Sequence, residues 1–445
     1  MLGRINDLIE KENYKELKEE ITILNEADIA EVIQDIEEEK KRIKVFRLLP
    51  KDLAADTFAN LDIDLQQSLI SSLSMTEAGN IIENLYTDDA ADLLDEMPAS
   101  MVTKILKNTT LETRKDINAI LNYPDNSAGS IMNTEFLDLK ENLTIEQAII
   151  KIRREGKDKE TIDTCYILDK KRQLIGEIPL RYLIFNKKEK LIKDVMETNP
   201  IYVYTYEDQE EVAAKFSKYD VNIMPVVDRE NKLVGIITVD DIVDILKEET
   251  TEDIEKMAAI SPTDKPYMKT SVFETWKKRI PWLLILMISA TFTGKIIQSY
   301  EEALASYVVL TSFIPMLMDT GGNAGGQASV TIIRGISLKE IEFSDIYKII
   351  WKEVRVSFLV GLTLALANFA KLLLIDQVSL TIAFVVCLTL LVTVLFAKVI
   401  GCTLPLLAKK IGFDPAVMAS PFITTLVDAI SLFAYFNIAT MILQL

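Results

Sequence analysis

The sequence predicts a multidomain fold: an all-α superhelical N-domain, an α/β domain of two similar halves, and an α-helical transmembrane domain with five spans. Charge is divided unevenly, because the overall −18 consists of −21 on residues 1–275 and +3 on residues 276–445. Apolar stretches of about 20 residues, the length that crosses a bilayer, occur only in the second part. Residues 131–250 alternate strand and helix patterns. An acidic, soluble region is therefore followed by a membrane region.

A loose internal repeat runs through the first 130 residues. Its copies begin near Ala27, Lys51, Thr76 and Asp88, and each opens with acidic residues before an apolar stripe. This pattern is typical of short helices stacked into a superhelix. Acidic residues at a helix start complement the helix dipole, so capping explains them on spacing alone. Asp88 and Asp92 lie four residues apart on one face, where like charges repel.

An acidic helical face is expected at the end of the α/β region. Its carboxylates recur at about four-residue spacing: Asp240, Asp241, Asp244, Glu248, Glu249, Glu252 and Asp253. Residues four apart advance by about 40° around a helix, so they form one slowly turning face. Only Lys247 and Lys256 relieve this charge. The pattern favours a divalent-cation interface, with a solvated acidic surface as the alternative.

Five segments are long and apolar enough to be candidate spans. They are Pro281–Tyr300, Ala303–Arg334, Val354–Leu374, Val378–Gly401 and Ala416–Leu443. Lys and Arg cluster before the first, between the second and third, and between the fourth and fifth, which predicts a cytosolic N-terminus and an extracytosolic C-terminus. The N-terminus has no signal-peptide pattern. Pro315 and the run Asp319–Gln327 interrupt the second segment and predict a broken helix that lines a cavity.

Polar groups inside the membrane segments indicate a cation path. An ionised carboxylate in a bilayer costs at least ~2.5 kcal/mol, so Asp428 is predicted to serve cations; a protonated, hydrogen-bonded Asp is the alternative. Asp414, before Pro415, is either a metal ligand or a helix N-cap. The run between Asp319 and Gln327 offers neutral oxygens and small residues, which permit a pore or simply close helix packing: Gly321, Gly322, Asn323, Gly325 and Gly326. Such oxygen ligands suit a hard cation such as Mg2+.

Several functions are excluded by composition. The chain has no histidine and three scattered cysteines, which argues against a zinc site or a histidine-based catalyst. The acidic region would repel nucleic acid. We find no nucleophile–base pair and no phosphate-cradling loop, so an enzyme is not expected.

Long motifs in the membrane region resemble the MgtE family of magnesium channels. They are Pro315–Gln327, Ile333–Gly335, Phe413–Pro421 and Thr424–Asp428. The resemblance implies a homodimer with the ion path between subunits, Asp428 as its central carboxylate and Asp414 as an accessory one. It further implies pore positions at Asn323, Gly325, Gly326 and Ser420, and a Mg2+ role for Asp88 and Asp92. Ser431 departs from the glycine that the family often has there.

The α/β region is similar to a tandem CBS domain. Its first half runs from about Ser130 to Lys193, and its second contains Ile223–Asp228 and Leu233–Asp241. Such pairs often bind adenine nucleotides through an acidic residue after the last strand. The first half has Tyr182 at that position, which puts ATP binding in doubt.

The expected protein is a Mg2+ channel or transporter for magnesium uptake in the cell membrane, a multi-pass homodimer in lipid. Mg2+ is both cargo and regulator, because Mg2+ bound between the acidic N-domain and the CBS pair would close the pore. The expected domains are 1–129 (N-domain), 130–249 (CBS pair), 250–279 (connecting helix) and 280–445 (pore). A CBS-regulated receptor without conduction and a Na+- or H+-coupled exchanger remain alternatives.

Overall fold

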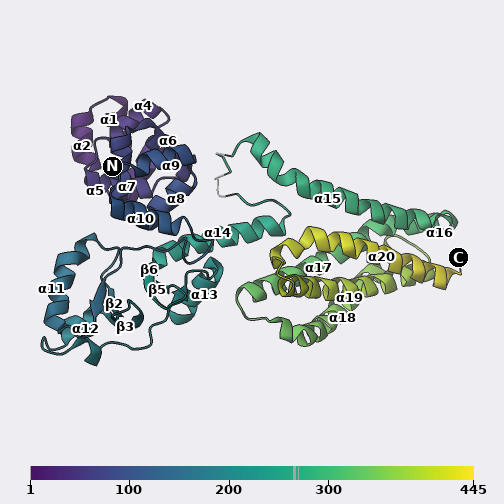
Figure 1. Ribbon diagram of the computed structural model, residues 1–445. Coiled ribbons are helices and arrows are strands. Elements are labelled where there is room, and N and C mark those ends of the chain that lie inside the picture. The colour runs from purple at the N-terminus through teal and green to yellow at the C-terminus, as the bar shows by residue number, and fades with distance from the viewer. Residues whose placement is uncertain (1, 264–266, 269, 445) are drawn as a thin grey trace. The chain divides into compact units, whose positions relative to one another are not determined.

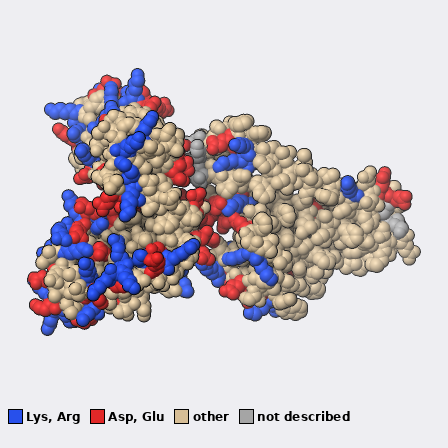
Figure 2. Space-filling model, in the orientation of Figure 1, with Lys and Arg blue, Asp and Glu red and all other residues tan. Residues whose placement is uncertain are grey.

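The computed structural model describes residues 2–263, 267–268 and 270–444. They form two compact units, residues 1–246 and residues 247–445. Figure 1 shows short helices and small sheets in the first unit and long helices in the second. Figure 2 shows that charged side chains crowd the surface of the first unit, whereas most of the surface of the long helices is uncharged.

The first unit opens with short helices that share one hydrophobic core. The predicted short helices are confirmed, and apolar residues at helical spacing, such as Ile29 and Ile33, are fully buried. Side-chain caps mark helix starts: the Ser74 hydroxyl accepts from the backbone N–H of Glu77, and the Glu77 carboxylate accepts from that of Ser74. The helices are α1 (Leu2–Glu10), α2 (Tyr14–Ile21), α3 (Glu26–Gln34), α4 (Glu39–Phe46), α5 (Lys51–Ala59), α6 (Ile63–Ser72), α7 (Met75–Asn84), α8 (Thr87–Asp95), α9 (Ala99–Leu106) and α10 (Leu111–Ile120).

The α/β part contains two similar halves, as predicted. Each half has a three-stranded sheet in which the middle strand pairs parallel with the first and antiparallel with the third. The first half comprises β1 (Asp138–Lys140), α11 (Ile145–Glu155), η1 (Gly156–Asp158), β2 (Thr164–Leu168), β3 (Leu174–Pro179), α12 (Leu180–Phe185) and η2 (Ile192–Asp194). The second comprises β4 (Val203–Tyr204), α13 (Gln209–Tyr219), β5 (Ile223–Val227), β6 (Leu233–Thr238) and α14 (Val239–Met257).

The helical and α/β parts of the first unit share a core. Ala91 of α8 and Ile120 of α10 belong to the same buried cluster as Val203 and Ile237. The two halves are also joined, because the N–H of Leu174 donates to the carbonyl of Asn231 at 3.0 Å. This packing places the start of α8 and the start of α14 in one compact body.

The predicted connecting helix, residues 250–279, is wrong as a single helix. Helix α14 ends where Ala259 adopts the left-handed conformation (φ 55°), and α15 (Val272–Ser299) starts at the cap Ser271. Helix α15 begins before the expected Pro281, which lies inside it. The described residues between the two helices, 258–263, 267–268 and 270–271, are not helical.

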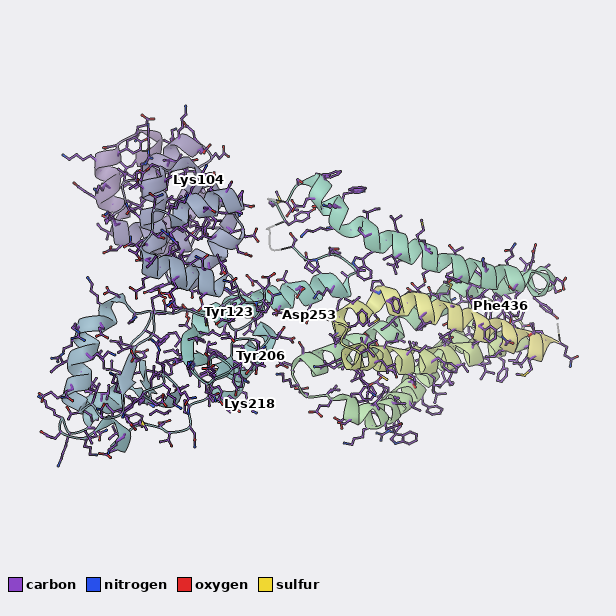
Figure 3. All side chains as sticks on the ribbon, in the orientation of Figure 1. Lys104, Tyr123, Tyr206, Lys218, Asp253 and Phe436 are labelled. Carbon is purple, nitrogen blue, oxygen red and sulfur yellow. The ribbon has the colours of Figure 1, made fainter. Side chains whose placement is uncertain are left out.

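The second unit is a bundle of long helices. Helix α19 packs on α17, α18 and α20, and α15 packs on α20. Aromatic stacking supports the contact between α15 and α20, since the ring centroids of Phe436 (Figure 3) and Tyr300 lie 4.7 Å apart. The remaining elements are α16 (Glu301–Ser306), η3 (Val308–Phe313), α17 (Ile314–Ser337), η4 (Phe343–Asp345), α18 (Ile346–Leu374), α19 (Leu380–Lys410), η5 (Pro415–Met418) and α20 (Ser420–Leu443).

The prediction of five membrane spans is not confirmed. Within the described residues, four segments are long and apolar enough to cross a membrane: Val272–Ser299, Phe343–Leu374, Leu380–Lys410 and Pro415–Leu443. The predicted span Ala303–Arg334 folds instead as α16, η3 and α17. Its glycines and polar groups lower its hydropathy, so α17 does not qualify although it has 24 residues.

The predicted break at Asp319–Gln327 is wrong, because α17 is continuous through this run. Its glycines form a contact face. A Cβ on Gly321 would lie 2.8 Å from side-chain carbons of Thr393 and Val427, and one on Gly325 would lie 2.7 Å from Ile423. The missing side chains therefore let α19 and α20 approach the backbone of α17.

We predict that Gly401→Ala destabilises this bundle. A Cβ at Gly401 would lie 2.2 Å from the carbonyl oxygen of Gly325, so the helices must separate. Overpacking of this kind costs about 1–3 kcal/mol. Thermal unfolding in detergent should show a lower Tm than the native protein. Gly294→Ala is the control, since a Cβ there meets nothing within 4 Å; equal Tm values for both variants would contradict the packing argument.

Candidate functional site

A group of carboxylates lies where helix α8 meets the α/β part of the first unit. Asp88 and Asp89 come from the first turn of α8, Glu160 from the loop before β2, and Asp241 from the first turn of α14. All four side chains are half-buried. We call these residues the α8–α14 carboxylate cluster.

Hydrogen bonds hold this cluster in place. The buried amide of Asn133 donates to Asp88 Oδ1 at 3.2 Å and to Glu160 Oε2 at 3.1 Å. The Thr238 hydroxyl donates to Asp241 Oδ2 at 2.6 Å. Asn133 thus ties α8 to the loop of Glu160 through one side chain.

The cluster is electrostatically unfavourable when all its members are charged. Burial is the main cause in each case, and neighbouring carboxylates add to it. Burial together with Asp89 and Asp241 raises the pKa of Asp88 well above its usual range. Burial and, to a smaller extent, the charge of Asp241 raise the pKa of Asp89 to about 6. Burial and, to a smaller extent, the charges of Asp241 and Asp240 raise the pKa of Glu160 to about 8. Burial also raises the pKa of Asp241, although its bond to Thr238 opposes this.

The cluster agrees only in part with the predicted sensor residues. Asp88 and Asp241 lie in it, and the charge of the exposed Asp240 acts on Asp89 and Glu160. Asp92 is exposed, because it lies on the outer side of α8 between buried Ala91 and Leu93. Asp89 and Glu160 belong to the cluster but were not predicted from the sequence. The adjacent pair Asp88–Asp89 was a visible signal for the first, whereas nothing in the pattern around Glu160 indicated the second.

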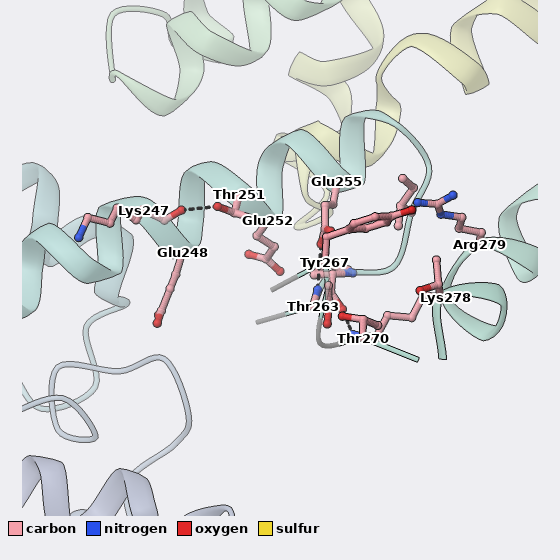
Figure 4. A pocket seen from close by; sticks show the side chains of 13 residues that line it. Lys247, Glu248, Thr251, Glu252, Glu255, Thr263, Tyr267, Thr270, Lys278 and Arg279 are labelled. Carbon is pink, nitrogen blue, oxygen red and sulfur yellow. Dashed lines mark hydrogen bonds between the residues drawn. The ribbon is translucent and has the colours of Figure 1, made fainter. Parts of the chain in front are cut away.

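The predicted acidic face lies on one continuous helix, but its members are divided between the two units. Asp240, Asp241 and Asp244 belong to residues 1–246, and the others belong to residues 247–445. In the second unit, Glu248, Glu252 and Glu255 line a pocket of about 460 Å3 beside Lys278 and Arg279 (Figure 4). Glu249 is half-buried.

The membrane bundle places Asp428 on α20, half-buried beside α17. Its Oδ1 atom is buried and has no hydrogen-bond partner among the described residues. The Asp319 carboxylate on α17 is near enough to act on it electrostatically. A buried carboxylate oxygen without a donor is costly, by about 1–3 kcal/mol, which marks it as a place for a cation or water.

Helix α17 has two unlike faces. Gly321, Gly322, Gly325 and Gly326 are buried, so Gly325 and Gly326 are better explained by helix packing than by a pore lining. Asp319, Asn323 and Gln327 follow each other at four-residue spacing and are exposed. This row, the α17 polar stripe, is unusual on a helix packed among apolar spans.

Asp414 caps a helix, which was one of its two predicted roles. Its Oδ1 accepts from the backbone N–H of Ala416 at 2.8 Å at the start of η5. The side chain of Ser420 lies outside the described part of the structure. Within the described residues, no three or more Asp, Glu or Cys side chains are arranged to hold a metal ion.

Comparisons with known proteins cover all parts of the chain. Family models match residues 24–126 (MgtE intracellular N domain), 192–248 (CBS domain) and 314–438 (MgtE, divalent cation transporter). The magnesium transporter MgtE of Thermus thermophilus is 32% identical over 444 residues, which cover 99% of this chain and 98% of that protein. MgtE of Bacillus subtilis is 32% identical over 440 residues, covering 99% and 97%.

Two solved structures resemble the N-terminal part. The soluble part of a magnesium transporter is 30% identical, with a TM-score of 0.53, and covers 56% of this chain and 97% of its own. The cytosolic domain of the Mg2+ channel MgtE in complex with ATP is 31% identical, also with a TM-score of 0.53, covering 55% and 100%.

We predict that the α8–α14 carboxylate cluster makes the stability of the N-terminal part pH-dependent. Glu160 has an ordinary pKa of 4.5 when unfolded and about 8 when folded, so the folded state keeps a proton that the unfolded state loses. The free energy of unfolding should therefore fall as pH rises from about 4.5 to about 8 in Mg2+-free solution.

Chemical denaturation of residues 1–257 across this range measures the slope. Glu160→Gln should remove about 2 kcal/mol of the pH-dependent loss, because it stays neutral. Asp95→Asn, on the exposed side of α8, should leave the slope unchanged. An unchanged slope in Glu160→Gln would show that Glu160 ionises normally in the folded protein.

Proposed function

Because the chain belongs to the MgtE family, whose named members are magnesium transporters, we propose that it is a Mg2+ channel for magnesium uptake that cytosolic Mg2+ closes. It is a multi-pass membrane protein of a family without an enzymatic reaction. The observation that carries the proposal is Asp428, a carboxylate among apolar spans with a buried oxygen that has no hydrogen-bond partner among the described residues.

The ion path is proposed to run along α17 and α20. Asp428 supplies the central carboxylate, and the α17 polar stripe supplies Asp319, Asn323 and Gln327. One or two carboxylates suffice for Mg2+, because it keeps most of its water ligands. The amide oxygens of the stripe can accept hydrogen bonds from those waters.

The path is proposed to form between two copies of the chain. The stripe is exposed in a single copy, and lipid is a poor environment for polar side chains. A second copy related by two-fold symmetry would cover it and bring a second Asp428 to the path. With α17 counted as a span, the distribution of Lys and Arg supports a cytosolic N-terminus and an extracytosolic C-terminus.

Gating is proposed to depend on the α8–α14 carboxylate cluster. At low Mg2+ its like charges favour separation of α8 from α14. Bound Mg2+ neutralises them and stabilises the compact arrangement by mass action. Since no three of these carboxylates already form a metal site, the cluster must tighten when Mg2+ binds. ATP is a second proposed ligand, supported by the ATP complex of the similar cytosolic domain, although Tyr182 replaces the expected acidic residue.

The two alternative functions predict different Mg2+ fluxes. A receptor without conduction gives no flux, and a coupled exchanger gives flux that follows a Na+ or H+ gradient. Mg2+ uptake into proteoliposomes with and without those gradients separates both from a channel.

We predict that Asp428→Asn lowers Mg2+ uptake into proteoliposomes at least about tenfold, since losing a charged contact costs about 1.5–3 kcal/mol. Asp376→Asn, between α18 and α19, is the matched control and should conduct normally. Native uptake by Asp428→Asn would remove Asp428 from the path.

We also predict that the double variant Asp89→Asn and Asp241→Asn weakens inhibition by cytosolic Mg2+. With fewer charges, the cluster opens less at low Mg2+ and gains less from binding it. The half-inhibitory Mg2+ concentration, measured by patch clamp, should rise about tenfold. Asp95→Asn should keep the native value. If the double variant and Asp95→Asn have the same half-inhibitory Mg2+ concentration, the sensor lies elsewhere.

A further inference from the structure

A lysine occupies the space between two carboxylates of the second unit that the sequence suggested as metal ligands. The Lys256 ammonium lies 2.6 Å from Asp414 Oδ2 and 2.5 Å from Glu252 Oε1. Glu252 and Lys256 are one turn apart on α14, whereas Asp414 lies in the loop between α19 and α20. One ammonium therefore joins the end of α14 to the membrane bundle.

We propose that Lys256 is a built-in cation that holds α14 against the α19–α20 loop when no divalent cation is bound. The inference rests on the proposed function and adds a determinant of its regulation. Two carboxylates brought together without a cation repel each other, and a divalent ion would relieve that repulsion. Here the ammonium relieves it permanently, because it is part of the chain.

The contact is well placed to be stable. The side chain of Lys256 is 22% exposed, and those of Glu252 and Asp414 are 38% and 34% exposed. The Lys256 ammonium donates a hydrogen bond to Asp414 Oδ2 at 2.6 Å, and Glu252 lies one turn before it on the same helix. Lys256 also lies in the last turn of α14, where the helix dipole favours a cation.

The geometry connects this contact to both neighbouring membrane helices. Beyond α14, the N–H of Ser261 donates to the carbonyl of Lys278 at 3.1 Å, and the Lys278 ammonium donates to the carbonyl of Pro262. The chain is thus fastened to the start of α15, beside the pocket in Figure 4.

On the other side, Asp414 uses its second oxygen to cap η5, which leads directly into α20. Asp428 is on α20. Displacement of the end of α14 therefore acts on α15 through the Ser261–Lys278 contact and on the helix of Asp428 through Asp414.

Distance measurements between spin labels test the proposal directly. Labels at Ile254→Cys on α14 and Phe413→Cys in the loop use exposed positions, and the described native cysteines are buried. In the full-length protein with native Lys256, the distance should be the same in EDTA and in Mg2+. In Lys256→Met the distance should lengthen in EDTA and return in Mg2+, because Mg2+ then replaces the missing ammonium. Lys256→Arg keeps the charge and should behave as native.

A flux measurement follows the consequence for conduction. At zero cytosolic Mg2+, Lys256→Met should conduct about twofold to fivefold more than the native channel, the ratio expected for one partly exposed ion pair. Lys256→Arg should match the native flux. A distance in Lys256→Met that is unchanged by EDTA would overturn the proposal.

The two levels of inference fail differently. Suppose that Mg2+ does not inhibit the native protein, but the distance between the labels in Lys256→Met still lengthens in EDTA. The proposed function is then wrong, and the lysine contact stands. If native inhibition is present and Lys256→Met matches native in both measurements, only the lysine contact is wrong.

Discussion

Carboxylates that are buried or crowded together must be balanced by protons or cations, and this requirement shapes the structure around them. Such carboxylates occur in three places, and their charge is balanced differently in each. The α8–α14 cluster raises the pKa values of its carboxylates, most clearly that of Glu160. Asp414 and Glu252 share the ammonium of Lys256. Asp428 keeps a buried oxygen without a partner among the described residues. The single positive charge of Lys256 therefore offsets one of the two negative charges beside it, whereas the other two places depend on protons or cations.

The membrane bundle depends on close approach of backbones. Gly321, Gly325 and Gly401 have no side chain to separate α17 from α19 and α20, and this brings Asp428 next to α17. The same packing directs Asn323 and Gln327 to the opposite side of α17. Glycines and polar residues alternate in the same short run because a helix must satisfy both faces at once.

The two ends of α14 face different neighbours. Its first turn contributes Asp241 to the cluster with α8, and its last turn contributes Lys256 to the contact with the α19–α20 loop. Helix α14 is one continuous helix between these two contacts. This is the physical basis on which regulation by cytosolic Mg2+ is proposed.

The order of the domains, the paired α/β halves and the continuous acidic helix could be predicted from the sequence, because they depend on local periodicity. The cost of a charge among apolar residues singled out Asp428 as a candidate pore residue, which stays a prediction. The sequence also separated the acidic part from the apolar one. Tertiary structure alone decided which carboxylates meet: Glu160 joins Asp88 and Asp89, and Lys256 reaches Asp414 across 158 positions of the chain. It also decided that the glycine run is a packing face within an unbroken helix. These outcomes depend on contacts between elements distant in sequence, which spacing along one helix does not encode.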